Sequence, residues 1–80
     1  MPYFVYILKS KIVNRYYIGY TNDLRRRLYE HNSGKTKSLF KYIPLEIIYK
    51  EEYKTIEEAR RRERQIKSYK HGEAFKKLIK

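Results

Sequence analysis

The chain has 80 residues, carries 20 lysine and arginine residues against nine acidic ones, and contains no cysteine. This length allows a single domain with a thin core, and the lack of cysteine excludes a disulfide framework and a thiolate metal cluster. A net charge of +11 on so small a body makes a polyanion, above all nucleic acid, the expected partner.

Two strands are predicted first. Tyr3–Leu8 (YFVYIL) is rich in aromatic and β-branched residues, which favour strands. A polar turn at Lys9–Asn14 separates it from a second such segment, Arg15–Tyr20 (RYYIGY), so the two segments should pair as an antiparallel hairpin. Gly19 interrupts the second strand, which often marks a place where another group approaches the backbone closely.

A helix is predicted next. Thr21 or Asn22 is expected to cap it, and Asp23 suits its positive N-terminal end. The helix should run to about Asn32, because the pair Ser33-Gly34 is typical of a helix end.

This helix places two charged or titratable residues beside its leucines. At about 100° of rotation per residue, Arg27 and His31 share one stripe with Leu24 and Leu28. A guanidinium that is buried without a partner is costly. We therefore expect Arg27 to meet a carboxylate or a phosphate.

A basic loop without a clear period, Lys35–Tyr42 (KTKSLFKY), follows the first helix. Pro44 precedes a third predicted strand, Leu45–Tyr53 (LEIIYKEEY). The capping box from Thr55 to Glu58 then starts a second helix.

The second helix should run to about Lys70 and end at Gly72, with Glu73–Ile79 as a short terminal helix. The order β-β-α-β-α-α predicts an α+β fold with a small three-stranded antiparallel sheet flanked by helices. Glu63 lies in the apolar stripe of the second helix together with Ile56. This inward carboxylate also needs a partner, either a cation or a metal ion.

Each of these residues also has a structural interpretation. Arg27 and Glu63 would satisfy each other as a half-buried salt bridge. A histidine on an apolar face, such as His31, is more often a hydrogen-bonded core residue than a catalyst, and strand tyrosines usually serve packing. Only the combination points to a function, and its members in chain order are Tyr6, Tyr17, Gly19, Arg27, His31 and Glu63.

With this combination the chain resembles the GIY-YIG nuclease superfamily, and most closely its small single-domain bacterial members. Phe4-Val5-Tyr6 stands where the family has its GIY triplet, and Tyr17-Ile18-Gly19 is an intact YIG triplet. The segment TNDLRRRLYEHN is similar to the first helix of the family, and EARRRERQIK to its metal-binding helix. The resemblance spans nearly the whole chain and implies one GIY-YIG-like nuclease domain over residues 1–80.

The resemblance implies a metal-dependent endonuclease that hydrolyses DNA phosphodiester bonds with one divalent ion, Mg²⁺ or Mn²⁺, bound by Glu63. One carboxylate is enough for Mg²⁺, because water and phosphate complete its shell. Arg27 would offer a planar fork to phosphate oxygens. Tyr6 or Tyr17 would act as general base, with the choice open, and His31 would hydrogen-bond a tyrosine hydroxyl or accept its proton.

Two departures from the family pattern stand out. Phe4 replaces the first glycine of the GIY triplet, as in several small members. Several members carry an asparagine after the metal-binding helix, whereas Lys67–Lys80 contains none; Asn32 is the nearest candidate and lies elsewhere in the chain. Gly19 is expected to leave room for substrate or solvent beside the sheet.

Basic residues off the buried stripe are candidates for contacting the DNA backbone, with plain solubility charge as an equal alternative. These candidates are Arg25, Arg26, Lys35, Lys37 and Lys41. The expected partner is DNA, branched or single-stranded forms included, in repair or processing; RNA is less expected. We expect a monomer or weak dimer, with a protein partner as a candidate source of specificity.

The sequence also leaves two other functions open and indicates where in the cell the protein is expected. A non-catalytic basic nucleic-acid-binding module and a ribosome-associated basic protein are the alternatives to an enzyme. The longest apolar run, Tyr3–Leu8, is far shorter than the roughly 20 residues that cross a bilayer. No signal peptide is apparent either, so a soluble cytoplasmic protein without a membrane partner is expected.

Overall fold

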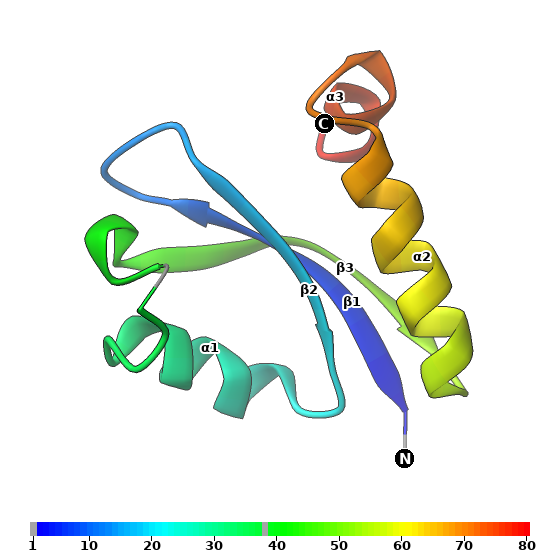
Figure 1. Ribbon diagram of the computed structural model, residues 1–80, viewed down its shortest axis with the longest axis horizontal. Coiled ribbons are helices and arrows are strands. Elements are labelled where there is room, and N and C mark those ends of the chain that lie inside the picture. Colours follow the sequence, from blue (N-terminus) through cyan, green and yellow to red (C-terminus); the bar gives the residue numbers. More distant parts are fainter. Residues whose placement is uncertain (1, 38) are drawn as a thin grey trace.

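The computed structural model, which describes residues 2–37 and 39–80, has the expected α+β fold (Figure 1). Its sheet consists of β1 (Tyr3–Ser10), β2 (Tyr16–Thr21) and β3 (Leu45–Tyr53) in the spatial order β2-β1-β3. Both neighbouring pairs are antiparallel, so the predicted hairpin and the three-stranded sheet are confirmed. The turn after β1 starts later than predicted, because β1 continues to Ser10.

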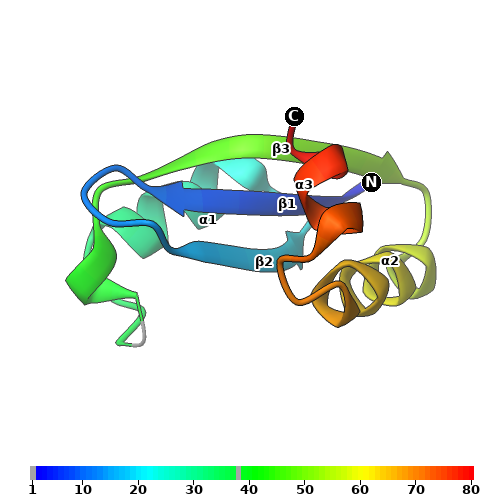
Figure 2. The same ribbon diagram turned by 90° about the horizontal axis from the view of Figure 1, so that it is seen from above.

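The central strand β1 is buried on both faces of the sheet, because helices cover both (Figures 1 and 2). Successive side chains of a strand point to opposite faces, and the core divides accordingly. Val5 and Ile7 pack with residues of the helices α2 (Ile56–Ser68) and α3 (Glu73–Leu78). Tyr6 and Leu8 pack with residues of the helix α1 (Leu24–Asn32) and of the loop that follows it. The sheet therefore separates two small apolar clusters rather than covering one.

The first helix, α1 (Leu24–Asn32), begins one residue later than expected. Asp23 is its cap, and the Asp23 carboxylate accepts the backbone N–H of Arg26 at 3.1 Å. Thr21, expected as a cap, instead accepts the N–H of Asp23 at 3.1 Å. The prediction of Thr21 or Asn22 was wrong because all three residue types cap helices well, and the turn out of β2 decides between them.

The end of α1 agrees with the sequence. Ser33 is the C-terminal cap, and Gly34 has a φ of +85°, a conformation that favours glycine. The basic loop that follows contains a short 3₁₀ turn, Phe40–Tyr42, which its sequence did not indicate. Ser38 of this loop lies outside the described residues.

The second helix, α2 (Ile56–Ser68), starts with the predicted capping box, in which Thr55 and Glu58 each bind the backbone of the other. It ends two residues before Lys70, because Lys70 and His71 adopt left-handed backbone conformations with φ of 49° and 64°. Gly72 then precedes α3 (Glu73–Leu78).

An ion pair fixes α2 to the edge strand β3. Arg62 donates from Nε and Nη2 to the two carboxylate oxygens of Glu51, each at 2.9 Å. The hydroxyls of Tyr49 and Tyr53 donate to the same carboxylate. Burial alone would raise the pKa of Glu51, but the hydrogen bonds from Arg62 and the two tyrosines hold it at about 2. This pair attaches the middle of α2 to the sheet.

The helices are short and strongly charged. In the described part of the chain, none of them combines the length and apolar character that a membrane crossing requires.

Candidate active site

The hydroxyl of Tyr6 is the centre of the site. Tyr6 pairs with Gly19 of β2 across the sheet and is only 2% exposed. A Cβ atom on Gly19 would lie 2.6 Å from the Tyr6 hydroxyl oxygen and 2.8 Å from the adjoining ring carbon. The close approach expected at Gly19 is thus confirmed, but the approaching group is the phenol of Tyr6 rather than substrate or solvent.

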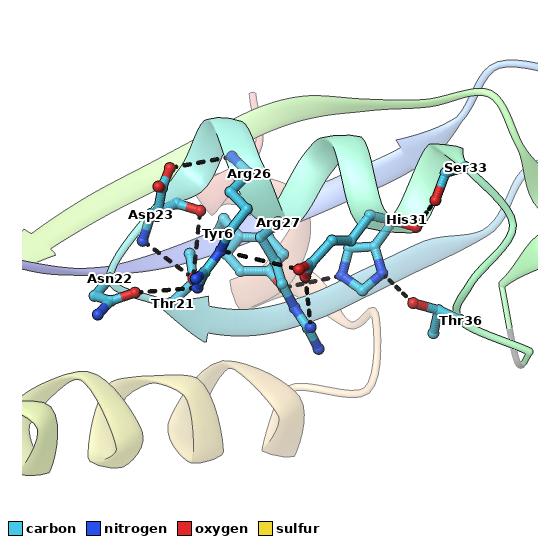
Figure 3. A network of polar contacts seen from close by, with 10 residues as sticks. Tyr6, Thr21, Asn22, Asp23, Arg26, Arg27, His31, Ser33 and Thr36 are labelled. Carbon is cyan, nitrogen blue, oxygen red and sulfur yellow. Dashed lines mark hydrogen bonds and ion pairs between the residues drawn. The ribbon is translucent and has the colours of Figure 1, made fainter.

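His31 holds the hydroxyl of Tyr6 from the side of α1 (Figure 3). His31 is fully buried, with Nε2 3.2 Å from the Tyr6 oxygen and Nδ1 2.8 Å from Oγ1 of Thr36. Burial, followed by the charge of Arg27, lowers the pKa of His31, so the imidazole is neutral near pH 7. A neutral ring has one N–H, so one nitrogen donates a hydrogen bond and the other accepts one, between Tyr6 and Thr36.

Arg27 reaches the same hydroxyl from the preceding turn of α1. Its pKa is raised, first by hydrogen bonding to Tyr6 and also by Glu30, whose Oε1 lies 3.2 Å from Nη1. The Arg27 side chain is still 39% exposed, so a face of the guanidinium stays open to solvent. Figure 3 shows Arg27 and His31 extending from α1 toward Tyr6.

The expected structural salt bridge between Arg27 and Glu63 is wrong. Among the described residues, Arg27 pairs with Glu30 on its own helix, and Glu63 pairs with Lys67 at 3.4 Å. Helical spacing predicted correctly that both residues face inward, but it could not tell that i, i+3 and i, i+4 neighbours would satisfy them.

Glu63 nevertheless lies close enough to act on Tyr6. Burial raises the pKa of Tyr6 to about 12; Arg27 opposes this rise, whereas the charges of Tyr17 and Glu63 add to it. The Tyr6 hydroxyl is therefore protonated at neutral pH. The side chain of Glu63 is 19% exposed, so solvent still reaches it.

Tyr17 is the more accessible of the two candidate tyrosines. It is half-buried, and its ring lies 6.2 Å from that of Tyr6 and 5.1 Å from that of His31. Tyr17 also lines a surface hollow, whereas Tyr6 does not line any of those described. The structure thus groups four predicted residues, Tyr6, Tyr17, Arg27 and His31, while Glu63 on α2 acts on Tyr6 through its charge.

The predicted DNA-contacting residues all lie on the surface. Arg25, Arg26, Lys35, Lys37 and Lys41 are exposed, as expected for either of their interpretations. Arg26 makes local contacts within its own helix region, to Asn22 at 3.4 Å and to Glu30 at 3.9 Å.

Two roles were missed or misassigned from the sequence. Thr36, which orients His31, lies in a loop without periodicity, so nothing in the sequence marked it. Asn32 was the nearest candidate for a missing active-site asparagine, but its amide binds both backbone groups of Leu45, at 2.7 and 3.1 Å. Asn32 therefore connects α1 to the start of β3 and plays a structural part.

The donor set suits a lightly coordinated divalent ion. In residues 2–37 and 39–80 no three His, Asp or Glu side chains gather as a metal cluster. Glu63 offers one carboxylate whose charge acts on Tyr6, and its present partner is a single lysine that a divalent ion can displace. Mg²⁺ is commonly held in proteins by one or two carboxylates with water and phosphate, so these residues fit such an ion.

Comparisons with known proteins identify the family of this chain. The family model of the GIY-YIG catalytic domain matches residues 2–76. A UPF0213 protein of Staphylococcus epidermidis is 38% identical over 77 residues, which cover 95% of this chain and 93% of that protein. UPF0213 protein YazA of Bacillus subtilis is 43% identical over 58 residues, which cover 71% of this chain and 58% of YazA.

A solved structure is similar as well. The solution NMR structure of a UPF0213 protein from Bacillus halodurans has 36% sequence identity and a TM-score of 0.51. The similarity covers 85% of this chain and 72% of that one.

Proposed function

The chain belongs to the GIY-YIG catalytic domain family, and from this premise we propose that it is a nuclease that hydrolyses DNA phosphodiester bonds with one divalent metal ion. The observation that supports the proposal is the grouping of the Tyr6 and Tyr17 phenols with the Arg27 guanidinium, where the charge of the Glu63 carboxylate also acts on Tyr6. These are the groups needed to orient a water molecule and to offset phosphoryl charge.

Arg27 would bind the phosphate. Its exposed face can donate hydrogen bonds to an approaching anion, and its planar fork matches two phosphate oxygens. The hydrogen bond to Glu30 holds the guanidinium in place before the substrate arrives. Preorganised donors of this kind stabilise the charge that develops in the transition state.

Tyr17 rather than Tyr6 would contact the attacking water. Tyr6 is almost fully buried and its pKa is raised to about 12, so it gives up its proton reluctantly. Tyr17 is half-buried and opens onto the surface. In this assignment Tyr6 is a positioning residue that links His31 to Arg27, and neutral His31 shares a hydrogen bond with the Tyr6 hydroxyl.

Glu63 would hold the metal ion. When bound, the divalent ion supplies positive charge to the phosphate oxygens and to the leaving oxygen. Lys67, now paired with Glu63, would then be released toward the neighbouring solvent. Mg²⁺ and Mn²⁺ both suit an oxygen donor of this kind.

The cellular process, the compartment and the DNA-contacting residues are further parts of the proposal. We propose DNA processing or repair in the cytoplasm, by a monomer or weak dimer that gains specificity from a protein partner. The exposed cations on and after α1 would follow the DNA backbone: Arg25, Arg26, Lys35, Lys37 and Lys41.

The proposal is tested by incubating the purified protein with branched, nicked and single-stranded DNA. Cleavage in Mg²⁺ or Mn²⁺ that EDTA abolishes is the expected result. Salt-sensitive binding without any product would instead support a non-catalytic nucleic-acid-binding module.

A further inference from the structure

A hollow of about 310 Å³ opens between β2 and the C-terminal end of α2. Its size lies at the lower end of the range of roughly 300–1,000 Å³ that small-molecule sites occupy. Tyr17 belongs both to this hollow and to the candidate active site, so the two share one side chain. The lining residues are Tyr16, Tyr17, Ile18, Ile66, Lys67, Lys70 and His71.

The lining combines three kinds of group. Ile18 and Ile66 are buried and form an apolar floor, and the rings of Tyr16 and His71 stand at the side. The two lysines and the histidine are exposed. No acidic residue is among the lining residues, although Glu63 lies one helical turn before Lys67.

A second hollow of about 240 Å³ shares the Tyr16 and His71 side chains with the first. The two rings lie 5.3 Å apart, and the ring of Phe75 supports both, at 5.2 Å from Tyr16 and 4.7 Å from His71. Tyr16 and His71 thus form a braced aromatic wall with a hollow on each side. Lys76 lines the second hollow, so that hollow also has a cation.

The backbone at the wall adopts a costly conformation. Lys70 and His71 have φ of 49° and 64°, which non-glycine residues seldom adopt. Hydrogen bonds from the Lys70 N–H to Lys67 and from the Gly72 N–H to Tyr69 stabilise this turn. Residues held in such conformations cluster at binding sites, and here the turn brings Lys70 and His71 to the rim of the hollow.

The chemistry of this surface matches one nucleotide. Aromatic rings offer stacking to a base of any sequence, and ammonium groups pair with its phosphate. A purely apolar ligand would leave the lysines unused, and a simple anion would leave the aromatic wall and the apolar floor unused.

We propose that the hollow is a subsite for one nucleotide of the DNA next to the bond that is cut, with Lys67 and Lys70 at its phosphate and Tyr16 and His71 at its base. The location of this subsite next to the cleaved bond rests on the proposed nuclease function. Binding of a nucleotide at this place is independent of it.

Lys67 connects the subsite to the metal-binding residue. Its Nζ lies 3.4 Å from Glu63 while its side chain also lines the hollow. A divalent ion at Glu63 would weaken that pair and free Lys67 for the nucleotide phosphate. Metal and nucleotide should therefore favour each other's binding.

The test measures the affinity of a fluorescein-labelled dT₄ oligonucleotide over a salt series. Lys70→Ala should weaken binding about tenfold and reduce the slope of log K against log salt by about 0.7, the value for one lost single-strand phosphate contact. His71→Ala should weaken binding without changing the slope. Lys50→Ala, an exposed lysine of β3 outside all proposed sites, should leave affinity within twofold and the slope unchanged.

A second variant separates binding from folding. Lys70→Gly removes the same ammonium group while relieving the left-handed conformation, so it should bind as weakly as Lys70→Ala and melt at the same or a higher temperature. If both variants bind dT₄ as tightly as the parent chain, with the same salt slope, the subsite is refuted.

Cleavage assays keep the two proposals distinguishable. Loss of dT₄ binding in the Lys70 variants of a protein that never cuts DNA would support the subsite and contradict the nuclease. Metal-dependent cutting together with unchanged dT₄ binding in those variants would support the nuclease and contradict the subsite.

Discussion

The Tyr6 hydroxyl lies 3.2 Å from Nε2 of His31, and both side chains are buried. This contact joins β1 to α1 across one of the two apolar clusters. It explains why a histidine lies on the leucine side of α1, because a buried ring nitrogen needs a partner. The same contact positions the hydroxyl that Arg27 also binds.

Replacing Tyr6 and Tyr17 separately should show which tyrosine mainly stabilises the fold and which mainly serves catalysis. Tyr6→Phe leaves Nε2 of His31 without its buried partner and should lower the free energy of unfolding by about 1–3 kcal/mol. Tyr17→Phe should cost less stability but reduce cleavage by about 10²–10⁴-fold if Tyr17 is the general base. Urea unfolding and single-turnover cleavage of both variants check this; the reverse pattern would assign the base to Tyr6.

Gly19→Ala should damage the site through Tyr6. The new Cβ would lie 2.6 Å from the hydroxyl oxygen, so the phenol must move and the overpacking should cost about 1–3 kcal/mol. Gly34→Ala is the matched control, since Gly34 has a φ of +85° but nothing within 4 Å of an added Cβ. Both variants should lose stability, yet only Gly19→Ala should also lose cleavage at a temperature where both are folded.

His31 should make stability depend on pH. Its pKa in the folded chain is below the ordinary value of 6.5, so between those two values the unfolded chain binds more protons. Stability from this group is therefore full above pH 6.5 and declines as the pH falls below it. Urea unfolding at pH 7.5 and 5.5 should show this decline, and His31→Gln should reduce it; an equal decline in the His31→Gln variant would contradict the prediction.

The ion pair between Glu51 and Arg62 should stabilise the attachment of α2 to the sheet. Removing either partner should cost about 1.5–3 kcal/mol, as for other hydrogen bonds to charged groups. Since the pKa of Glu51 is held at about 2 against 4.5, this stability is present above pH 4.5 and is lost as the pH falls toward 2. A double-mutant cycle with Glu51→Gln and Arg62→Gln checks it; a coupling energy near zero would contradict it.

Much of the fold followed from local sequence patterns. The strand Leu45–Tyr53 and the capping box at Thr55 appear at the predicted positions, because period, composition and capping all agreed there. The cap of α1 was predicted at the wrong residue because three neighbouring residues all suit that position. The end of α2 was missed because lysine and histidine, unlike glycine, do not indicate a left-handed turn, which Lys70 and His71 nevertheless form.

The site was predicted where helical geometry applied and missed where tertiary contacts decided. The inward positions of Arg27, His31 and Glu63 follow from their rotation around the helix axis. The actual partners do not: Glu30 lies outside the apolar stripe of α1 but still reaches Arg27. Thr36 reaches His31 through the path of a loop that has no pattern.

In the proposed mechanism Glu63 serves catalysis, whereas the exposed basic residues bind DNA. Glu63→Gln keeps the size of the side chain but removes its charge, and Glu57→Gln, on the exposed face of the same helix, is the control. The measurement is metal-dependent cleavage and salt-dependent DNA binding by the parent chain and both variants. We predict that Glu63→Gln abolishes cleavage and keeps binding, while Glu57→Gln changes neither; full cleavage by Glu63→Gln would contradict the account.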